Sequence, residues 1–294
     1  MSSIKGIFKR RFTKLISKVY DPLVDIKIGN QHIKIPFSHA LRENVLVYPE
    51  LNFNLARVVK YAAEKADDVK VIDIGANVGD TVAYIRNFSN TPILCIDGDK
   101  KYLDILRGNI KQYKNIAVCH SIVGNETAEK KVELKSERGT AFIVEGNTKI
   151  KVKTLEDILQ EYPEFKNSKI LKLDTDGYDT FILKGSKKYL EKNKPILFFE
   201  FDPYLIKVND DPFTITEFLK ECGYRYLMFY MSNGDFLLSC DIFQESIIKE
   251  LIHYFSGRNI LLYTDICAYS ENDKEIFEFT VAEEIKHYKK ARAY

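Results

Sequence analysis

A glycine-containing turn between a short apolar strand and a helix is the feature that most constrains the fold of this chain. The segment Val71 to Thr81 reads Val-Ile-Asp-Ile-Gly-Ala-Asn-Val-Gly-Asp-Thr. Gly75 and Gly79 lack a Cβ atom, so the backbone can turn sharply and a ligand can approach it closely. A helix that begins near Gly79 would present free N–H groups to that ligand. The segment predicts an α/β fold that binds a cofactor at this turn.

The glycine spacing indicates which cofactor this turn can hold. A nicotinamide or flavin dinucleotide requires Gly-x-Gly-x-x-Gly, because the pyrophosphate lies against the backbone at the second glycine. Asn77 occupies that position. A side chain there is tolerated by the methionine moiety of S-adenosylmethionine, and Asp73 supplies negative charge suited to its amino group or sulfonium. We therefore expect S-adenosylmethionine at the following residues of the turn: Asp73, Gly75, Ala76, Asn77, Gly79, Asp80 and Thr81.

Short β-branched runs alternate with helical stretches after Val71, which predicts βαβ units and a mostly parallel, twisted, Rossmann-like sheet. The expected strands are 70–75, 92–97, 116–122, 169–174 and 195–201, and the expected helices are 79–88, 99–113, 155–161, 179–192 and 213–222. Residues 130–154 predict an inserted β-hairpin. The Asn233-Gly234 corner predicts a second hairpin, whose antiparallel strands close the sheet. In the tail we expect a helix over 243–256, a strand over 260–268 and a helix over 281–291.

Three segments follow from this pattern. Residues 1–68 form a lead-in, 69–240 the cofactor-binding core, and 241–294 an α/β extension packed on the core. Residues 1–20 are basic and carry apolar residues at helical spacing, which predicts an amphipathic helix. That helix could contact an anionic membrane surface, the body of the protein or a second subunit.

Composition narrows the functional classes. The formal net charge is only +2, so a nucleic-acid partner is not expected. The five cysteines form no CxxC pair, which argues against a zinc site and a disulfide framework and favours a reducing compartment. The chain has no apolar run long enough to span a bilayer, so we expect a cytoplasmic protein, with peripheral membrane contact as one role open to the first helix.

Polar residues follow the second and third strands. Asp97 ends the second strand and is placed to accept hydrogen bonds from both ribose hydroxyls, with Gly98 beside it. Asp99 is expected to cap the next helix. Ser121 lies at the end of the third strand, where it either contacts the adenine ring or faces the sheet. His120 is a candidate general base, although a lone strand histidine is more often structural.

The fourth and fifth strands end in acids. Asp174 and Asp176 follow one strand, and Glu200 ends the other. Asp174 and Glu200 come directly after apolar runs, which favours a site over simple solvation. A carboxylate desolvated by apolar neighbours can remove a proton from a hydroxyl, so Asp176 or Glu200 is the expected base. The three acids are also candidate ligands for Mg²⁺ or Ca²⁺.

Several blocks resemble the FkbM-type methyltransferases in order and spacing: Val71 to Thr81, the Asp97 region, Thr154 to Leu159, Leu171 to Asp179 with Leu183 to Gly185, and Pro195 to Glu200. The family block Lys-[Ile/Leu]-Asp-[Val/Ile]-Glu-Gly-x-Glu is similar to Lys172 to Asp179, where both glutamates are aspartates. The family's Phe-Glu-Pro is matched by Ile96-Asp97-Gly98, which keeps the acid.

This resemblance, which covers roughly residues 40–225, implies a class I methyltransferase fold and O-methylation with S-adenosylmethionine. It also implies an acceptor hydroxyl on a sugar or secondary metabolite, often within bacterial surface-polysaccharide pathways. Two alternatives stay open, a nicotinamide-dependent oxidoreductase and a non-catalytic binding protein that keeps the methyltransferase fold.

Overall fold

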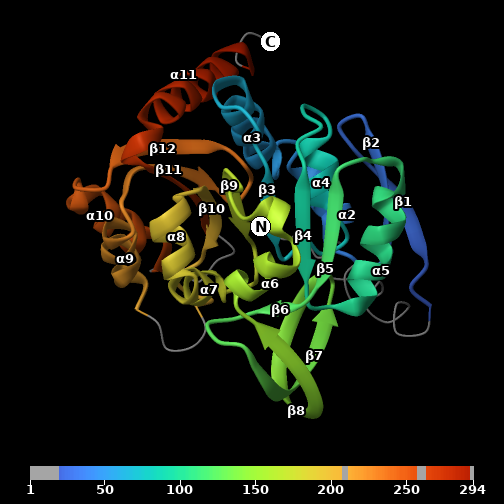
Figure 1. Cartoon of the computed structure of the whole chain (residues 1–294). Coiled ribbons are helices and arrows are strands. Elements are labelled where there is room, and N and C mark those ends of the chain that lie inside the picture. Colours follow the sequence, from blue (N-terminus) through green and yellow to red (C-terminus); the bar gives the residue numbers. More distant parts are fainter. Residues whose placement is uncertain (1–19, 207–210, 257–262, 292–294) are drawn as a thin grey trace.

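The computed structural model describes residues 20–206, 211–256 and 263–291, and its centre is a mostly parallel β-sheet (Figure 1). In this part of the chain the sheet has eight strands in the order β12-β11-β13-β10-β9-β3-β4-β5. Their bounds in that order are Phe236–Asp241, Tyr224–Met231, Thr264–Ser270, Ile196–Phe201, Ile170–Leu173, Val71–Ile74, Ile93–Asp97 and Ile116–His120. The five strands from β10 to β5 are parallel, while β13, β11 and β12 add antiparallel pairs. The predicted Rossmann-like α/β fold with antiparallel closing strands is confirmed.

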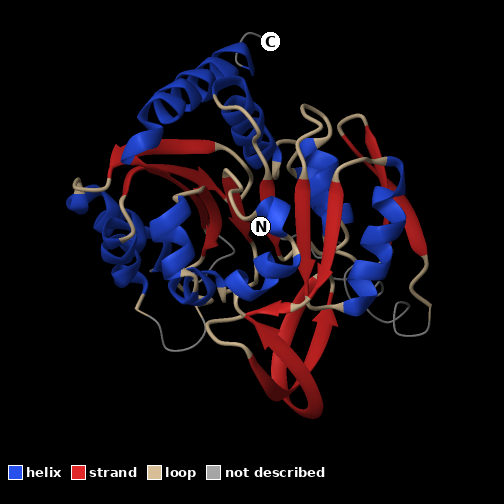
Figure 2. Ribbon diagram, in the orientation of Figure 1, coloured by secondary structure: helices blue, strands red, loops and turns tan. Residues whose placement is uncertain are grey.

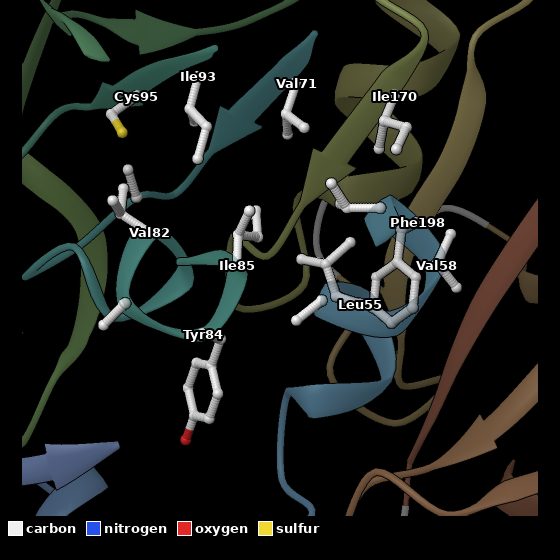
Figure 3. Packing of buried hydrophobic residues seen from close by; sticks show 14 of the residues in the cluster. Leu55, Val58, Val71, Val82, Tyr84, Ile85, Ile93, Cys95, Ile170 and Phe198 are labelled. Carbon is white, nitrogen blue, oxygen red and sulfur yellow. The ribbon is translucent and has the colours of Figure 1, made fainter. Parts of the chain in front are cut away.

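Both faces of the sheet are covered by helices (Figure 2). The central strands β3 and β9 are apolar apart from Asp73 and Lys172 and are buried along their whole length, as expected for parallel strands covered on both sides. One face packs on α3 (Phe53–Lys65), α4 (Asp80–Ile85), α5 (Lys100–Asn109) and α11 (Lys274–Ala291). Figure 3 shows Leu55 and Val58 of α3 and Tyr84 of α4 on this face. The other face packs on α6 (Leu155–Glu161), α7 (Asp179–Gly185), α8 (Lys187–Asn193), α9 (Ile215–Glu221) and α10 (Glu245–Ser256).

The structure corrects several predicted element bounds. The helix expected over 179–192 is two helices, α7 and α8, separated at Ser186. A Cβ atom on Gly185 would lie 2.6 Å from Asn125 Cα, so the close approach of this backbone requires glycine at the break. The final helix α11 begins at Lys274, earlier than the expected 281, and the last strand β13 covers Thr264–Ser270 where 260–268 was expected.

The lead-in contributes the antiparallel pair β1 (Leu23–Ile28) and β2 (Gln31–Pro36), then α2 (Leu41–Val47) and α3. Asn109 of α5 exchanges two hydrogen bonds with the backbone of Lys34, which fixes β2 on the core. Apolar residues of the lead-in, the core and the tail join one buried cluster. The amphipathic helix expected over 1–20 lies outside the described residues except for Tyr20.

The expected inserted hairpin is present as β7 (Ala128–Glu137) and β8 (Thr140–Lys153), which pairs with the short β6 (Ile122–Val123). It extends below the main sheet in the view of Figure 1. Its strands are longer than the sequence suggested, and the register shifts between Lys131 and Val132. All five cysteines are buried and free. Within the described ranges, none of the helices has the length and apolar character needed to cross a bilayer.

Candidate active site

A cavity of about 310 Å³ lies at the carboxyl ends of β3, β4 and β9 and reaches the base of the inserted hairpin. Ligands bind at this end of the strands in open α/β sheets. Its walls are mainly apolar and aromatic: Ile74, Ile96, Tyr102, Ile122, Val123, Val152, Tyr178, Phe181 and Ile182. Polar side chains line it at or just after the strand ends, namely Asp97, Asp99, Ser121, Asp174, Thr175 and Asp176, and Lys130 lines it from the inserted hairpin. This combination of apolar walls and a few placed polar groups is typical of a small-molecule site.

The turn after β3 has the left-handed backbone that its glycines allow. Gly75 has φ +81°, and a Cβ atom there would lie 1.9 Å from the carbonyl oxygen of Asp174. Glycine at this position therefore lets the turn pack against the end of β9. Asn77 has φ +46°, a conformation that asparagine tolerates better than most residues. Gly75 and Asn77 line the cavity, whereas Ala76, Gly79 and Asp80 do not.

Asp97 lies at the end of β4 with both carboxylate oxygens fixed by backbone donors. Asn77 N–H donates to its Oδ2 (2.8 Å) and Asp99 N–H donates to its Oδ1 (2.7 Å). Burial raises the pKa of Asp97, whereas these two bonds favour the charged form. Each oxygen keeps a further lone pair. Asp97 is thus a preformed hydrogen-bond acceptor on the cavity wall.

The residues around Asp97 have some of the positions that the sequence predicted for them. The Asp99 side chain accepts from Lys101 N–H and Tyr102 N–H, which confirms that Asp99 caps α5. Gly98 and Ser121 line the cavity. His120 is exposed at the edge strand β5, its Nε2 lies 3.1 Å from Gly98 O, and it lines neither cavity described here.

Lys172 of β9 forms a buried ion pair with Asp73 of β3. Its Nζ lies 2.9 Å from Asp73 Oδ1, 3.7 Å from Asp174 Oδ2 and 3.1 Å from the carbonyl oxygen of Gly75. Burial alone would lower the pKa of Lys172, but Asp73 and Asp174 raise it above its usual value. Asp73 is fully buried and does not line the cavity. Its negative charge faces Lys172, where the sequence suggested a ligand amino group or sulfonium.

A second, smaller chamber of about 20 Å³ lies beside the first, at the ends of β9, β10 and β13. It is lined by Asn52, Leu55, Thr81, Lys172, Leu173, Asp174, Phe198, Glu200, Tyr263 and Asp265. Asp174 lines both spaces, so it marks their junction. Glu200 and Asp265 are opposite each other in the antiparallel β10–β13 pair, so their side chains lie on one face of the sheet.

The acids near this chamber have raised pKa values. Burial and the neighbouring Asp174 raise the pKa of Glu200 well above its usual value. Burial raises the pKa of Asp265 to about 8 and that of Asp179 to about 7, with Asp174 adding to both. Burial also raises the pKa of Asp80 to about 6. Carboxyl groups of this kind can accept and return protons near neutral pH.

The family described as Methyltransferase FkbM domain matches residues 73–226, which is more than half of the chain. The chain belongs to the FkbM methyltransferase family. The enzyme class expected from the sequence, an S-adenosylmethionine-dependent methyltransferase with the Rossmann-like fold of class I, is confirmed at the level of this family. No curated protein matches the chain.

Solved structures give distant likenesses. The methyltransferase FkbM from Methylobacillus flagellatus KT is 15% identical with a TM-score of 0.40, and the match covers 69% of this chain and 44% of that one. This FkbM-family chain therefore spans less than half the length of that protein. A SAM-dependent methyltransferase from Agrobacterium tumefaciens is 9% identical, with a TM-score of 0.43 and coverage of 84% and 70%. The tRNA (uracil-54, C5)-methyltransferase of Pyrococcus abyssi, in complex with S-adenosyl-L-homocysteine, is 12% identical, with a TM-score of 0.41 and coverage of 84% and 44%.

The larger cavity suits the cofactor of the FkbM family. Ile96, Ile122 and Ile182 give the cavity apolar walls on which an adenine ring can pack, and Asp97 can accept from a ribose diol. The carboxylates of Asp174 and Asp176 border the same space and would favour a cationic sulfonium and ammonium group. A cofactor bound this way would contact, of the residues predicted from sequence, Gly75, Asn77, Asp97, Gly98, Ser121, Asp174 and Asp176.

The geometry does not support a metal site at the three candidate acids. Over residues 20–206, 211–256 and 263–291, no group of three or more His, Cys, Asp or Glu side chains is arranged to hold a metal ion. The candidate ligands are divided, since Asp176 lines the larger cavity and Glu200 the smaller chamber.

Sequence reasoning missed three residues of this site in the FkbM-family chain. Lys172 belongs to the recognised family block, but its partner Asp73 is remote in sequence. Asp265 interrupts an apolar strand, the same signal that singled out Glu200, so it could have been found. Asn54, at the start of α3, donates to Asp265 Oδ2 (3.2 Å) and had no recognisable signal.

Proposed function

We propose that this protein transfers a methyl group from S-adenosylmethionine to a hydroxyl of a sugar or glycan acceptor. The observation that carries the proposal is the group of carboxyl side chains around the small chamber next to the cofactor cavity, whose volume of about 20 Å³ can receive a single hydroxyl group. Sugar hydroxyls donate hydrogen bonds, and carboxylates are their strongest side-chain acceptors. The family resemblance further suggests that this acceptor belongs to a bacterial surface polysaccharide or a related metabolite.

The reaction requires the acceptor oxygen to be held in line with the methyl group, and the hydroxyl proton to move to a base. The bound cofactor supplies an electrophilic methyl group on a sulfonium. Asp176 on the larger cavity and Glu200 in the chamber are the two acids proposed as base, and the raised pKa of Glu200 suits a group that takes up a proton. Orientation of the acceptor by the remaining carboxyl groups would contribute further to the rate.

The charge at the site limits the acceptor. Asp174, Glu200 and Asp265 face one chamber, and Lys172 is already paired with Asp73. The raised pKa values of Glu200 and Asp265 indicate that negative charge is already unfavourable in this chamber, so an anionic group would be disfavoured there, and we propose a neutral polyhydroxyl acceptor. The net charge of +2 supports no nucleic-acid partner. We also propose a cytoplasmic location, because five buried free cysteines suit a reducing compartment.

The test combines binding with turnover. Titration calorimetry should show that the protein binds S-adenosylhomocysteine and does not bind NAD. Methyl transfer from labelled S-adenosylmethionine would then be measured on a panel of neutral and anionic saccharides. Glu200→Gln and Asp176→Asn are compared with Glu221→Gln, which changes a half-exposed surface acid.

We expect the variant of the true base to lose about 100-fold or more in kcat while it binds S-adenosylhomocysteine normally. The Glu221→Gln control should retain full activity. Failure to bind S-adenosylhomocysteine would overturn the cofactor assignment. Binding without transfer to any hydroxyl acceptor would favour the non-catalytic alternative.

A further inference from the structure

The side chain of Asn77 connects the cofactor-binding turn to the inserted hairpin. Its Nδ2 donates to the carbonyl oxygen of Gly139 (2.5 Å), at the tip of the hairpin. Its Oδ1 lies 3.2 Å from His39 Nε2. Leu41 N–H donates to His39 Nδ1 (3.2 Å), so the imidazole proton is on Nε2 and His39 donates to Asn77. Asn77 therefore ties the turn to two segments that are distant in sequence.

The hairpin tip is held by further contacts. Gly139 N–H donates to the hydroxyl of Tyr102 (3.0 Å), and Ala40 N–H donates to the carbonyl oxygen of Arg138 (2.8 Å). Arg138 also forms an ion pair with Glu43, with Nη2 3.0 Å from Oε2. Gly139 has φ +106°, and a Cβ atom there would lie 2.6 Å from the His39 ring. The tip is thus fitted closely to the lead-in and to the cofactor turn.

These contacts meet at the wall of the cofactor cavity. Asn77 and Tyr102 both line the cavity, and both hold Gly139. The backbone N–H of Asn77 donates to Asp97, the proposed ribose ligand. At its base the hairpin lines the same cavity through Lys130 and Val152. The hairpin therefore contacts the cavity at its base and, through Asn77 and Tyr102, at its tip.

We propose that the inserted hairpin is a strap that retains the cofactor, and that Asn77 is a positioning residue coupling cofactor binding to docking of the strap tip. This inference rests on the proposed function, because it assigns the larger cavity to S-adenosylmethionine. It also accounts for a side chain at the position where dinucleotide sites require glycine. If docking strengthens cofactor binding by some factor, the cofactor stabilises the docked tip by the same factor.

Hydrogen exchange measures tip opening directly, because the amides of Gly139 and Ala40 are bonded only when the tip is docked. Exchange would be followed with and without S-adenosylhomocysteine, and its dissociation rate would be measured by stopped flow. Asn77→Gly removes the side chain and adopts φ +46° without strain. Arg138→Gln loosens the tip at a residue that does not line the cavity. Lys149→Gln, which breaks an exposed pair with Glu129 on the same hairpin, is the control.

In the unmodified protein S-adenosylhomocysteine should slow exchange at both amides. Asn77→Gly and Arg138→Gln should each release S-adenosylhomocysteine about tenfold faster than the unmodified protein, and the ligand should no longer slow exchange at the two amides. Lys149→Gln should match the unmodified protein in both measurements. Two results would overturn the strap and leave the proposed function intact. In the first, S-adenosylhomocysteine binds the unmodified protein without changing hydrogen exchange at the two tip amides. In the second, both variants release S-adenosylhomocysteine at the rate of the unmodified protein. No binding to the unmodified protein would overturn both.

Discussion

The two sides of the active site surround their buried carboxyl groups with different partners. On the β4 side, both oxygens of Asp97 accept backbone N–H bonds, which fix the carboxylate and oppose the rise in pKa that burial causes. On the β10–β13 side, Glu200 and Asp265 face each other across two strands, and burial raises the pKa of both. The first arrangement suits the binding of a cofactor in one fixed geometry. The second suits a site that exchanges protons with its ligand.

Lys172 joins the two sides, since it pairs with Asp73 behind the cofactor turn and lies on the wall of the smaller chamber. A buried pair of this kind is costly to break, because the remaining charge has no partner. The following experiments test the contrast between the two sides, in order of expected effect.

Lys172→Met should destabilise the fold by about 3–5 kcal/mol, because it leaves Asp73 charged and buried without its partner. The free energy of unfolding in urea measures the effect. Lys187→Met removes an exposed lysine that pairs with Glu221 and should leave stability almost unchanged. Equal losses in the two variants would mean that the ion pair with Asp73 is not a stabilising link between the sides.

Asp97→Ala should weaken the binding of S-adenosylhomocysteine by about 1–3 kcal/mol, because a charged hydrogen-bond acceptor is lost. Titration calorimetry gives the dissociation constant. Glu200→Gln, on the other side, should leave this constant unchanged. An unaltered constant in Asp97→Ala would remove Asp97 from the cofactor site and cancel the proposed contrast.

Asp265→Asn should make the protein more stable than the unmodified form at alkaline pH. The pKa of Asp265 is raised from 3.8 to about 8, so its favourable contribution is complete below about pH 4 and is lost as pH rises to about 8. The stability difference between the two proteins should widen by at least about 1 kcal/mol between pH 5 and 8 and then level off. Asp104→Asn, at an exposed acid, is the control and should show no widening. A difference that stays constant with pH would show that Asp265 titrates normally.

The smallest effect is expected at His39, beside the strap tip. Burial lowers its pKa below 6.5; Asp21 and the bond to Asn77 oppose the shift, while Lys101 and Arg138 add to it. Because the folded state binds the proton less well, stability should fall as pH decreases through 6.5. The Tm of the unmodified protein should drop more than that of His39→Gln between pH 7.5 and 5.5. An NMR titration that places the pKa of His39 at or above 6.5 would contradict this.

Local patterns predicted most of the fold and part of the site. The glycine turn, the strand-end acids and the cap at Asp99 are short-range features, so the sequence alone could indicate them. Contacts between remote segments could not be predicted. The Asn77–Gly139 hydrogen bond spans 62 positions, and the Asn54–Asp265 bond spans 211. The break between α7 and α8 likewise depends on Asn125, which packs against Gly185 from another part of the chain.

The start of α3 and the strand β13 have a consequence for how this enzyme can diversify. Asn52, Asn54, Tyr263 and Asp265 lie outside the family region 73–226, yet all four surround or orient the smaller chamber. The turn after β3 and Asp97 lie inside that region. Under the proposed function, acceptor preference can therefore change through the sequence that flanks the family region, and chimeras that exchange only these flanks between relatives would test whether they retarget methylation.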